Sequence, residues 1–340
     1  MSIKEQVRQL WKLCFTDSDE FVELYFRMRY TDELNSYIEV GGKVVAALQR
    51  LPYPMIYEGT IVPTSYISGA CTHPDYRNRG VMKQLLMKAH RRMYEDGVVL
   101  STLIPAEEWL KAYYAKSGYA VCFQQGTKLL TRHDLPVDNF RSALKLEEIE
   151  LDKKLPDDVF AFFDSLQNLH ECRILHSAED LQVVLSDLQL SGGKLLAAYG
   201  EEKLKGLCFC LHENGRLSVK ELLGEDTLVE QQMLSSLFQY EAVSEIEALA
   251  PSAECNSDLG MARVIHVYSM LTLFARSHTN LYIQVVGDEA IPENNGFYNL
   301  ENGSCTCLYR PDKCYQLVSI EELPSLLFEG KHPYMNLMLN

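Results

Sequence analysis

The sequence predicts a mixed α/β fold of the α+β class, divided into more than one domain. Its 340 residues exceed the length of one ordinary domain. Segments with helical periodicity alternate with strand-like segments along most of the chain. The succession of elements in residues 1–130 returns in part between residues 157 and 250. We therefore expect two units of similar fold, followed by a third.

The first unit begins with two helices and a hairpin. Residues 3–14 and 19–29 are amphipathic, and Thr16-Asp17-Ser18 supplies helix caps before the second of them. Gly41-Gly42 predicts the turn of a hairpin within residues 36–49. The remaining elements expected here are an extended segment at 60–72, a helix at 80–96, a strand at 98–104, a helix at 109–116 and a strand at 119–130.

The junction between the extended segment and the next helix is the most informative stretch. His73-Pro74-Asp75 is turn chemistry, because a residue before proline avoids the helical region. The first N–H groups of a helix have no intrahelical partner, and the helix dipole adds partial positive charge there. Gly80 permits close approach, and Arg77, Arg79 and Lys83 add cationic charge. This pattern predicts an anion site suited to pyrophosphate, with a solvated basic loop as the alternative.

Two motifs in this unit resemble the signatures of the GNAT acyltransferase superfamily. Arg77-x-x-Gly80-x-Met82 follows a strand and opens an amphipathic helix, as the acetyl-CoA motif of that family does. Met82 stands where the family usually has Gly or Ala, and a large apolar residue there is familiar in the Eis-like (enhanced intracellular survival) branch. Residues 112–119, Ala-Tyr-Tyr-Ala-Lys-Ser-Gly-Tyr, resemble the second signature, a helix end of the pattern aromatic-Tyr-x-x-x-Gly-aromatic.

The resemblance implies acetyl-CoA as cosubstrate and suggests which residues bind it. Backbone groups at the end of the strand would polarise the thioester carbonyl, and the loop and helix opening would hold the pyrophosphate. A short segment before the second signature aligns loosely with residues that contact the CoA end in Eis-like enzymes. The residues assigned to acetyl-CoA in this way are Ala70, Cys71, Thr72, Arg77, Asn78, Arg79, Gly80, Val81, Met82, Lys83, Ala106 and Glu107.

Two catalytic residues are implied by the same resemblance. Tyr114 matches the general acid of the family, and a phenol of pKa about 10 can protonate a thiolate of pKa about 8.5. Tyr113 and Tyr119 are its neighbours, expected to serve as core and helix-end residues. The Eis-like branch points to the terminal carboxylate, here on Asn340, as the base. The alternative is that the apolar tail 331–340 is packed without a chemical role.

Residues 131–250 are expected to form a second, degenerate unit of the same GNAT-like fold. Residues 131–157 are polar, contain two prolines and predict a connector. Residues 221–230, the equivalent of the basic loop, are acidic and lack Arg-x-x-Gly, so we expect no CoA site there. The elements expected are helices at 157–169 and 178–188, a hairpin at 194–210, a strand at 216–223, a helix at 227–240 and a strand at 243–250.

Residues 251–340 are expected to form the third unit. Residues 260–275 are strongly apolar and predict a helix, which is more often core than a lipid cavity. The Met-x-Arg-Val opening of this segment resembles the sterol-carrier-protein-like domain of Eis-like enzymes. The fold implied is therefore tandem GNAT-type units plus a sterol-carrier-protein-like α/β domain. Further elements are expected at 281–288 (strand), 292–300 (turn and strand), 305–310 (strand) and 320–328 (helix).

Charge and cysteine content limit the partners. The net charge of −15 disfavours nucleic acid, and it fits either a cationic substrate or simple solubility. No apolar run is long enough to span a bilayer and the N-terminus has no secretory core, so we expect a cytoplasmic protein without a membrane partner. Ten cysteines without Cys-x-x-Cys predict reduced structural thiols. His170, Cys172 and His176 lack a recognised ligand spacing, so no metal is expected.

The function that these observations predict is an N-acetyltransferase that moves the acetyl group of acetyl-CoA to a small cationic amine, such as a polyamine or an aminoglycoside. One alternative is transfer to a lysine of a protein or peptide. Another is a catalytically inactive ligand-binding scaffold that retains a relic of the domain. The resemblance to Eis-like enzymes also implies a homo-oligomer, either a trimer or a hexamer made of two trimers.

Overall fold

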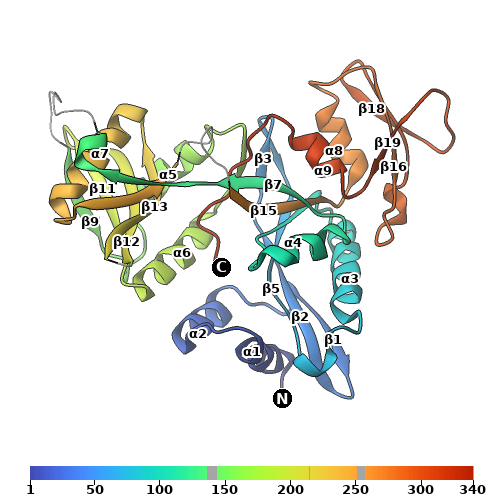
Figure 1. The fold of residues 1–340 in the computed structure, drawn as a ribbon, viewed down its shortest axis with the longest axis horizontal. Helices are drawn as coiled ribbons and strands as arrows, with labels where there is room; N and C mark the ends of the chain where they lie inside the picture. The colour runs from blue at the N-terminus through green and yellow to red at the C-terminus, as the bar shows by residue number, and fades with distance from the viewer. Residues whose placement is uncertain (136–143, 214, 251–256, 340) are drawn as a thin grey trace.

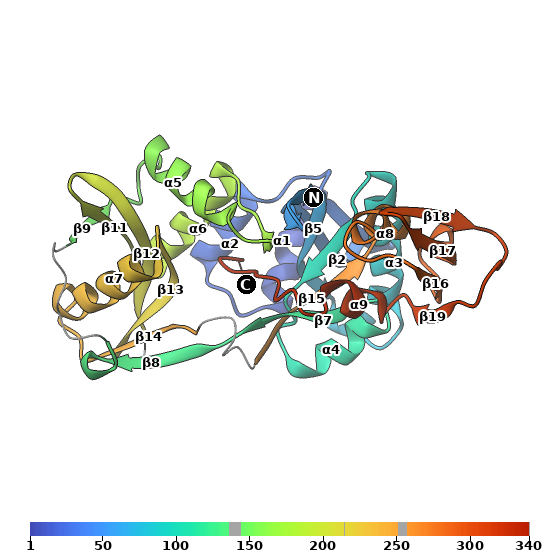
Figure 2. The same ribbon diagram turned by 90° about the horizontal axis from the view of Figure 1, so that it is seen from above.

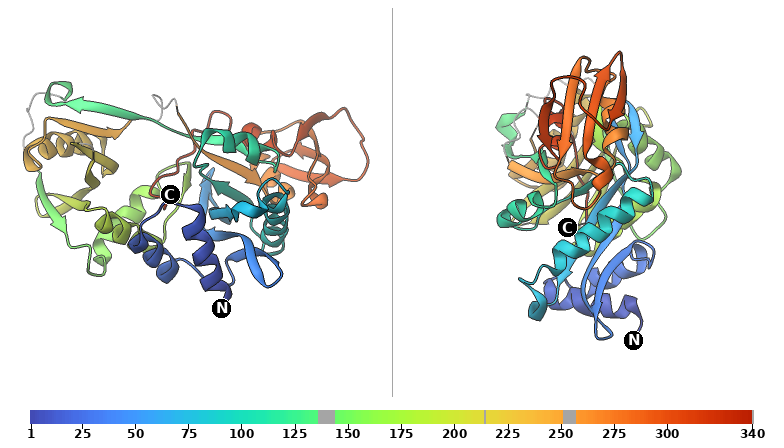
Figure 3. Two further views of the ribbon diagram at one scale, coloured as in Figure 1. Left: turned by 60° about the horizontal axis from the view of Figure 1, so that its bottom comes forward. Right: turned by 90° about the vertical axis from the view of Figure 1, so that its right-hand side faces the viewer.

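The structure, a computed structural model, describes residues 1–135, 144–213, 215–250 and 257–339. Three bodies lie side by side in Figure 1, with the N-terminal residues in the middle. The second unit lies on one side of them and the third unit on the other. The views in Figures 2 and 3 agree, and they place the C-terminal tail between the first and second bodies.

The central sheet contains six strands in the order β1-β2-β5-β6-β15-β7. Helices α1 (Ile3–Cys14) and α2 (Asp19–Met28) pack on one face and α3 (Val81–Glu95) on the other, because alternate side chains of β2 and β5 point to opposite sides. Helix α4 (Glu108–Ala115) contacts β7. The strands are β1 (Asn35–Val40), β2 (Lys43–Pro52), β5 (Thr64–Thr72), β6 (Leu100–Leu103), β7 (Ala120–Gln125) and β15 (Ser257–Val264).

The second body repeats this plan. Its sheet has the order β8-β14-β13-β12-β11-β9, with α5 (Asp157–Gln167) and α6 (Ala178–Leu190) on one face and α7 (Thr227–Tyr240) on the other. As in the central sheet, one central pair of strands, β13 and β14, is parallel. The strands are β8 (Thr127–Thr131), β9 (Lys145–Ile149), β11 (Lys194–Gly200), β12 (Lys203–Glu213), β13 (Arg216–Gly224) and β14 (Glu245–Leu249).

The two six-stranded sheets exchange one strand each. β7 and β8 are consecutive in the chain, yet β7 lies in the central sheet and β8 pairs with β14 of the second. β15 does the reverse, because it follows β14 in the chain and enters the central sheet between β6 and β7. In Figure 2, β7 and β8 run as one long ribbon from body to body. Each exchanged strand is antiparallel to its neighbour: β15 lies beside β6, and β8 lies beside β14. Because β6 and β14 are each the later strand of the parallel pair in their sheet, the two exchanges are equivalent.

The third body is a four-stranded sheet with two helices. Its strand order is β18-β17-β16-β19, and a buried ion pair of 2.7 Å between Arg263 of β15 and Asp288 ties it to the central sheet. A separate small sheet joins β10 (Cys172–Ile174) to the hairpin of β3 (Met55–Tyr57) and β4 (Thr60–Val62). The remaining elements are α8 (Val267–Phe274), α9 (Leu323–Phe328), β16 (Leu281–Val286), β17 (Gly296–Glu301), β18 (Ser304–Leu308) and β19 (Gln316–Ser319).

Most predicted elements are confirmed to within a few residues, and three expectations are corrected. The single helix predicted over 260–275 is wrong, because β15 ends at Val264 and α8 begins only at Val267. The strand predicted over 119–130 is two strands in two sheets. The predicted connector 131–157 contains β9, and its residues 136–143 lie outside the described residues. The division into units at residues 130 and 250 remains a prediction, since strand pairing crosses both positions.

Candidate active site

The parallel ladder between β5 and β6 stops after three residue pairs. On β5 it begins at Thr64 and ends at Tyr66. β5 then continues to Thr72 beside β2, whereas β6 ends at Leu103 and pairs on its other side with β15. The second half of β5 therefore borders an opening in the sheet, where the amide groups of an extended ligand can pair with a strand edge.

A bulge in β5 lies beside this opening. The register between β2 and β5 shifts between Ala47 and Gln49, and Gly69 in the bulge has a φ of +60°. A Cβ atom at Gly69 would overlap the indole ring of Trp11, so only glycine fits. Trp11 donates its indole N–H to Asp17 at 2.7 Å, which holds the loop between α1 and α2 close to the strand.

The basic loop after β5 is held by its own side chains. Arg77 donates from Nε to the carbonyl of Thr72 at 3.1 Å, and the guanidinium carbon of Arg79 lies 5.6 Å from the centre of the Tyr76 ring. Asn78 has a φ of +59°, which asparagine tolerates better than most residues. Both arginine side chains are exposed, so both can turn toward an anion.

The first turn of α3 directs its amide groups toward open space. Gly80 is the N-cap with a φ of +74°, and no described atom lies within 4 Å of the position that its Cβ would take. Because no described side chain caps this end, the first amides keep their unsatisfied partial charge. Lys83 on the same turn is exposed and pairs with Glu289 at 2.9 Å. This local geometry suits a phosphate group.

Tyr114 lies on α4, next to β5. The centre of its ring is 5.6 Å from that of Tyr113 and 5.9 Å from that of Tyr119, and its electrostatic neighbours include Cys71 and Tyr66. Burial, together with Tyr113 and Cys71, raises the pKa of Tyr114 to about 12. Within the described part of the chain the hydroxyl forms no hydrogen bond. It is therefore protonated at neutral pH and available as a donor.

The two neighbouring tyrosines have different surroundings. The hydroxyl of Tyr119 is buried and shares hydrogen bonds with Ser101 at 2.8 Å and with His90 at 3.0 Å. Burial raises the pKa of Tyr119 far above its usual range, and it raises that of Tyr113 as well. Tyr119 is thus occupied in the core, which leaves Tyr114 as the tyrosine whose hydroxyl is available beside β5.

Two thiols that lie far apart in the sequence, Cys14 and Cys71, meet beside the end of β5. The sulfur of Cys14, at the end of α1, lies 3.4 Å from the Thr72 carbonyl oxygen and hydrogen-bonds with the buried thiol of Cys71. This bond, with the Arg77 guanidinium nearby, lowers the pKa of Cys14 to about 6 although burial opposes it. The same bond and burial raise the pKa of Cys71. Residues 14 and 71 are distant in sequence, so only the fold reveals the pair.

The remaining sequence-predicted site residues are less closely grouped. Ala106 and Glu107 are exposed and precede α4, and the Glu107 carboxylate accepts a hydrogen bond from Trp109 at 2.6 Å. The predicted catalytic Asn340 lies outside the described residues. The structure thus brings together Tyr114, the end of β5 and, through Arg77, the basic loop.

Comparison with known families places the first body. Residues 2–122 match the family described as the acetyltransferase (GNAT) domain. These residues form a GNAT acetyltransferase domain. A search of curated proteins by sequence finds no match.

Solved structures resemble the chain over nearly its whole length. A GCN5-related N-acetyltransferase from Anabaena variabilis is 17% identical, with a TM-score of 0.76 over 95% of this chain and 86% of that one. A probable N-acyltransferase from Enterococcus faecalis is 14% identical, with a TM-score of 0.75 over 96% and 90%. Eis1 from Mycobacterium abscessus is 14% identical, with a TM-score of 0.70 over 96% and 87%. At these identities the likeness shows the fold, and with the GNAT domain it supports an N-acyltransferase.

The C-terminal tail docks between the GNAT domain and the second body. The main chain of Tyr334 pairs with β10, whose central Arg173 is buried. The buried carboxylate of Glu221 accepts hydrogen bonds from Tyr334 and from Asn336, both at 2.9 Å, and pairs with Arg173 at 3.4 Å. Burial raises the pKa of Glu221 although Arg173 lowers it. The tail is therefore anchored by specific polar contacts rather than loosely packed.

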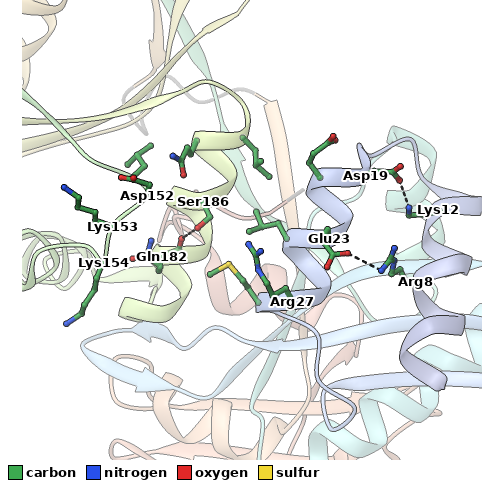
Figure 4. Close-up of a pocket in the computed structure, with 16 residues that line it drawn as sticks. Arg8, Lys12, Asp19, Glu23, Arg27, Asp152, Lys153, Lys154, Gln182 and Ser186 are labelled. Atoms are coloured by element: carbon green, nitrogen blue, oxygen red, sulfur yellow. Dashed lines mark hydrogen bonds and ion pairs between the residues drawn. The ribbon is translucent and has the colours of Figure 1, made fainter. Parts of the chain in front are cut away.

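A cavity of about 1150 Å³ lies between the first two helices of the GNAT domain and α6. In Figure 4, Lys12 pairs with Asp19 and Arg8 with Glu23 among its charged side chains, the latter at 3.2 Å. Both signs of charge are present, and no residue of the acetyl-CoA motif lines it. Size alone therefore does not make this cavity the active site.

Within residues 1–135, 144–213, 215–250 and 257–339, no three His, Cys, Asp or Glu side chains gather as a metal site would require. His170, whose spacing from Cys172 and His176 matches no recognised metal-ligand motif, stacks on Tyr334 with ring centres 5.5 Å apart. No helix in the same described ranges combines the length and the apolar character needed to cross a membrane.

Proposed function

We propose that this protein is an acetyl-CoA-dependent N-acetyltransferase whose acceptor is a small amine. The observation that carries the proposal is the broken β5–β6 ladder, which ends in a basic loop and an uncapped helix opening at Gly80. Such an opening can take the amide-rich arm of CoA, and the helix start can take its pyrophosphate. Acetyl-CoA would supply an activated thioester.

The binding roles fall to neighbouring groups. The amides of Val81 and Met82 and the side chains of Arg77, Arg79 and Lys83 would hold the pyrophosphate through charge-assisted hydrogen bonds. The open space at Gly80 fits this role, because a side chain there would stand where the ligand must approach. The backbone at Ala70, Cys71 and Thr72 would orient the thioester and polarise its carbonyl oxygen.

The proton needed by the departing CoA thiolate would come from Tyr114. Its pKa of about 12 keeps the hydroxyl protonated until negative charge develops on the sulfur. The neutral amine nitrogen forms the new C–N bond as the C–S bond breaks, the sulfur takes the phenolic proton, and the proton that the nitrogen gives up returns through solvent to the Tyr114 phenolate. The terminal carboxylate of Asn340 remains the sequence prediction for the base, and no step is assigned to it here.

The test is a CoA-thiol release assay on a panel of primary amines, run with wild type, Tyr114→Phe and Tyr113→Phe. We expect Tyr114→Phe to lose about 100-fold or more in kcat, because a general acid contributes about that factor, while CoA affinity by calorimetry stays unchanged. Tyr113→Phe is the matched control and should stay close to wild type. Equal turnover in Tyr114→Phe and wild type would remove the acid role. Failure of CoA to bind wild type would remove the proposal.

Two finer expectations belong with this proposal. We expect the third body, with its four-stranded sheet and the helices α8 and α9, to be the predicted sterol-carrier-protein-like domain. The predicted homo-oligomer is checked by light scattering of the purified protein, where a trimer or hexamer is expected. A monomer at the protein concentration of the activity assay would contradict the predicted homo-oligomer.

A further inference from the structure

Cys14 and Cys71 meet where the end of α1 packs against the end of β5. Cys14 is the last residue of α1, and Cys71 lies one position before the end of β5. Their side chains share a hydrogen bond, and both thiols are free in the structure. We call these two residues the thiol pair. Two thiols in hydrogen-bond contact lie close to the separation that a disulfide requires.

The members of the thiol pair differ in their access to solvent. Cys14 is partly exposed, whereas Cys71 is 5% exposed and belongs to the core that α1 covers. A small oxidant can therefore reach the sulfur of Cys14 first, with Cys71 directly behind it. Cysteines that sense oxidants have this arrangement, in which an accessible thiolate stands next to a second, resolving thiol.

The polar groups around Cys14 favour its thiolate form. The Cys71 thiol donates to it and the Arg77 guanidinium supplies a positive charge, and together they lower the pKa of Cys14 although burial opposes them. Arg77 is held in place, because its Nε donates to the Thr72 carbonyl oxygen at 3.1 Å. The sulfur of Cys14 lies 3.4 Å from the same oxygen, so the nucleophile and its cation share one anchoring atom.

A second pair of thiols in the chain shows that contact between two thiols is not sufficient. Cys208 and Cys210 on β12 also share a hydrogen bond, but both are fully buried in the core of the second body. This hydrogen bond, burial and two nearby carboxylates raise the pKa of Cys208. The thiol pair differs from this second pair in the partial exposure of Cys14 and in the cation at Arg77.

From these contacts we infer that the thiol pair is a modification site, at which a hydroperoxide oxidises Cys14 and Cys71 then closes a disulfide. With hydrogen peroxide, the Cys14 sulfur attacks one oxygen, the S–O bond forms, the O–O bond breaks and hydroxide leaves, which gives a sulfenic acid. The Cys71 sulfur then attacks the Cys14 sulfur, and the S–O bond breaks as hydroxide leaves with the Cys71 proton as water. Two electrons pass from the two sulfurs to one peroxide, which with one proton from solvent becomes two water molecules.

The disulfide changes the charge beside a proposed ligand of acetyl-CoA. In the reduced protein, the Cys14 thiolate attracts the Arg77 guanidinium that the pyrophosphate of acetyl-CoA is proposed to need. A disulfide carries no charge, so oxidation releases Arg77 from this competition, and we expect the oxidised protein to bind the cosubstrate more tightly. This part of the inference rests on the proposed function, whereas the oxidation itself does not.

The first test measures the disulfide directly. The full-length protein is treated with hydrogen peroxide at pH 7, denatured in iodoacetamide and analysed by mass spectrometry of its peptides without reduction. We expect the disulfide-linked peptides of Cys14 and Cys71 to appear, while Cys208 and Cys210 stay reduced as the control within the same chain. In Cys71→Ser, dimedone should instead trap the sulfenic acid on Cys14, because the resolving thiol is absent.

Two arginine variants test the role of charge. Arg77→Met removes the cation beside Cys14, and at pH 6 a rise of about one unit in the pKa of Cys14 would cut its thiolate fraction, and so its oxidation rate, about fivefold. Arg79→Met removes an exposed arginine of the same loop that is not among the groups acting on the pKa of Cys14, so the oxidation rate should stay unchanged. Thermal melts check that each variant is folded.

The second test measures ligand affinity. Dethio-CoA, which has the pyrophosphate but no thiol that could reduce the disulfide, is titrated by calorimetry into the reduced and the oxidised protein. We expect it to bind the oxidised form about fivefold more tightly, because an anion beside the pyrophosphate site is lost. Cys14→Ser is the control, and it should bind like the oxidised wild type both before and after peroxide treatment.

The outcomes separate this inference from the proposed function. If Cys14 stays reduced, or oxidises no faster than the exposed Cys314, the modification site is overturned whatever the activity of the protein. If the disulfide forms and dethio-CoA binds both forms equally, the link through Arg77 is overturned. If dethio-CoA binds neither form, the proposed function fails, while the disulfide, measured by mass alone, stands.

Discussion

Cys14 shows how one residue acquires reactivity that its sequence neighbours do not predict. Its pKa of about 6 results from the Cys71 thiol and the Arg77 guanidinium, both of which approach it only in the folded chain. Thiolate, rather than thiol, is the nucleophile, so at neutral pH Cys14 is mostly in its reactive form. The position matters because Arg77 is also a proposed ligand of pyrophosphate.

We predict that Cys14 is alkylated by iodoacetamide faster than Cys314 at pH 7, although Cys14 is only partly exposed and Cys314 is exposed. The rate at Cys14 should fall as the pH drops through about 6, since protonation removes the thiolate. Mass spectrometry of peptides after timed quenching measures both sites. Cys14→Ser is the control that identifies the fast phase, and faster labelling of Cys314 would contradict the prediction.

His176 carries a pH dependence of stability. It is buried beside the tail, where its Nε2 lies 3.2 Å from the Leu337 carbonyl oxygen, and burial lowers its pKa to about 4. A histidine whose folded pKa lies below the unfolded value of 6.5 contributes stability that is complete above pH 6.5 and is lost as the pH falls toward 4.

We predict that the free energy of unfolding of wild type falls by up to about 3 kcal/mol more than that of His176→Gln between pH 7.5 and pH 4. Urea unfolding of both proteins at several pH values measures the difference, and all other titrating groups are shared. His133→Gln, at an exposed histidine of the same protein, is the control. Parallel pH profiles for wild type and His176→Gln would exclude the buried neutral histidine as the cause.

At the scale of elements, β5 shows what a strand needs in order to border a binding site. Its bulge depends on Gly69, whose left-handed backbone and missing Cβ let Trp11 pack against the strand. Gly97, at the end of α3, has a similar φ of +75° with no described atom within 4 Å of a Cβ position. Substitution of Gly97 by alanine therefore measures the cost of the left-handed backbone alone, whereas the same substitution at Gly69 adds the clash with Trp11.

We predict that Gly69→Ala lowers the free energy of unfolding by about 2–4 kcal/mol, through overpacking added to left-handed strain. Gly97→Ala should lose only about 1–2 kcal/mol, from the backbone alone. Chemical denaturation of the full-length variants gives both values. Equal losses at the two sites would show that Trp11 yields to the added methyl group.

The helices and hairpins could be predicted because their signals are local. Ser2 and Ser18 cap α1 and α2, and the turn glycines and the basic loop lie within short stretches. The helix predicted over 260–275 failed for a physical reason. β15 lies in the interior of the central sheet with residues 260–264 buried, and an apolar run buried on both faces has no period that separates strand from helix.

The residues of the candidate site also fall into two groups, those that a local motif indicates and those that only the fold brings together. The residues from Arg77 to Lys83 are contiguous, and Tyr114 falls in a short motif, so the sequence could indicate both. Cys14 could not be found in that way, because its chemistry depends on Cys71, which the sequence does not connect to it. Contacts between distant segments leave no periodic signal in a single sequence.

At the scale of the whole molecule, the reciprocal strand exchange makes the GNAT domain dependent on the rest of the chain. β15 supplies the strand between β6 and β7, and it arrives only after the second body has been completed. Without it, β6 and β7 would each expose an unpaired edge, and the buried Arg263–Asp288 pair that ties the third body would be absent. The opening between β5 and β6 is thus held from its far side by a strand from the second half of the protein.

This dependence predicts that a fragment of residues 1–126, which contains the whole family match, does not form a stable domain. We expect it to aggregate or to lack a cooperative thermal transition, because two strand edges and the apolar residues around Met261 and Val264 would lose their partners. Joining residues 257–266 to its end through a flexible linker should restore a cooperative transition by circular dichroism and also CoA binding by calorimetry. A cooperative transition in the fragment alone would mean that β6 and β7 can pair directly, and that β15 is an addition to the site rather than part of its support.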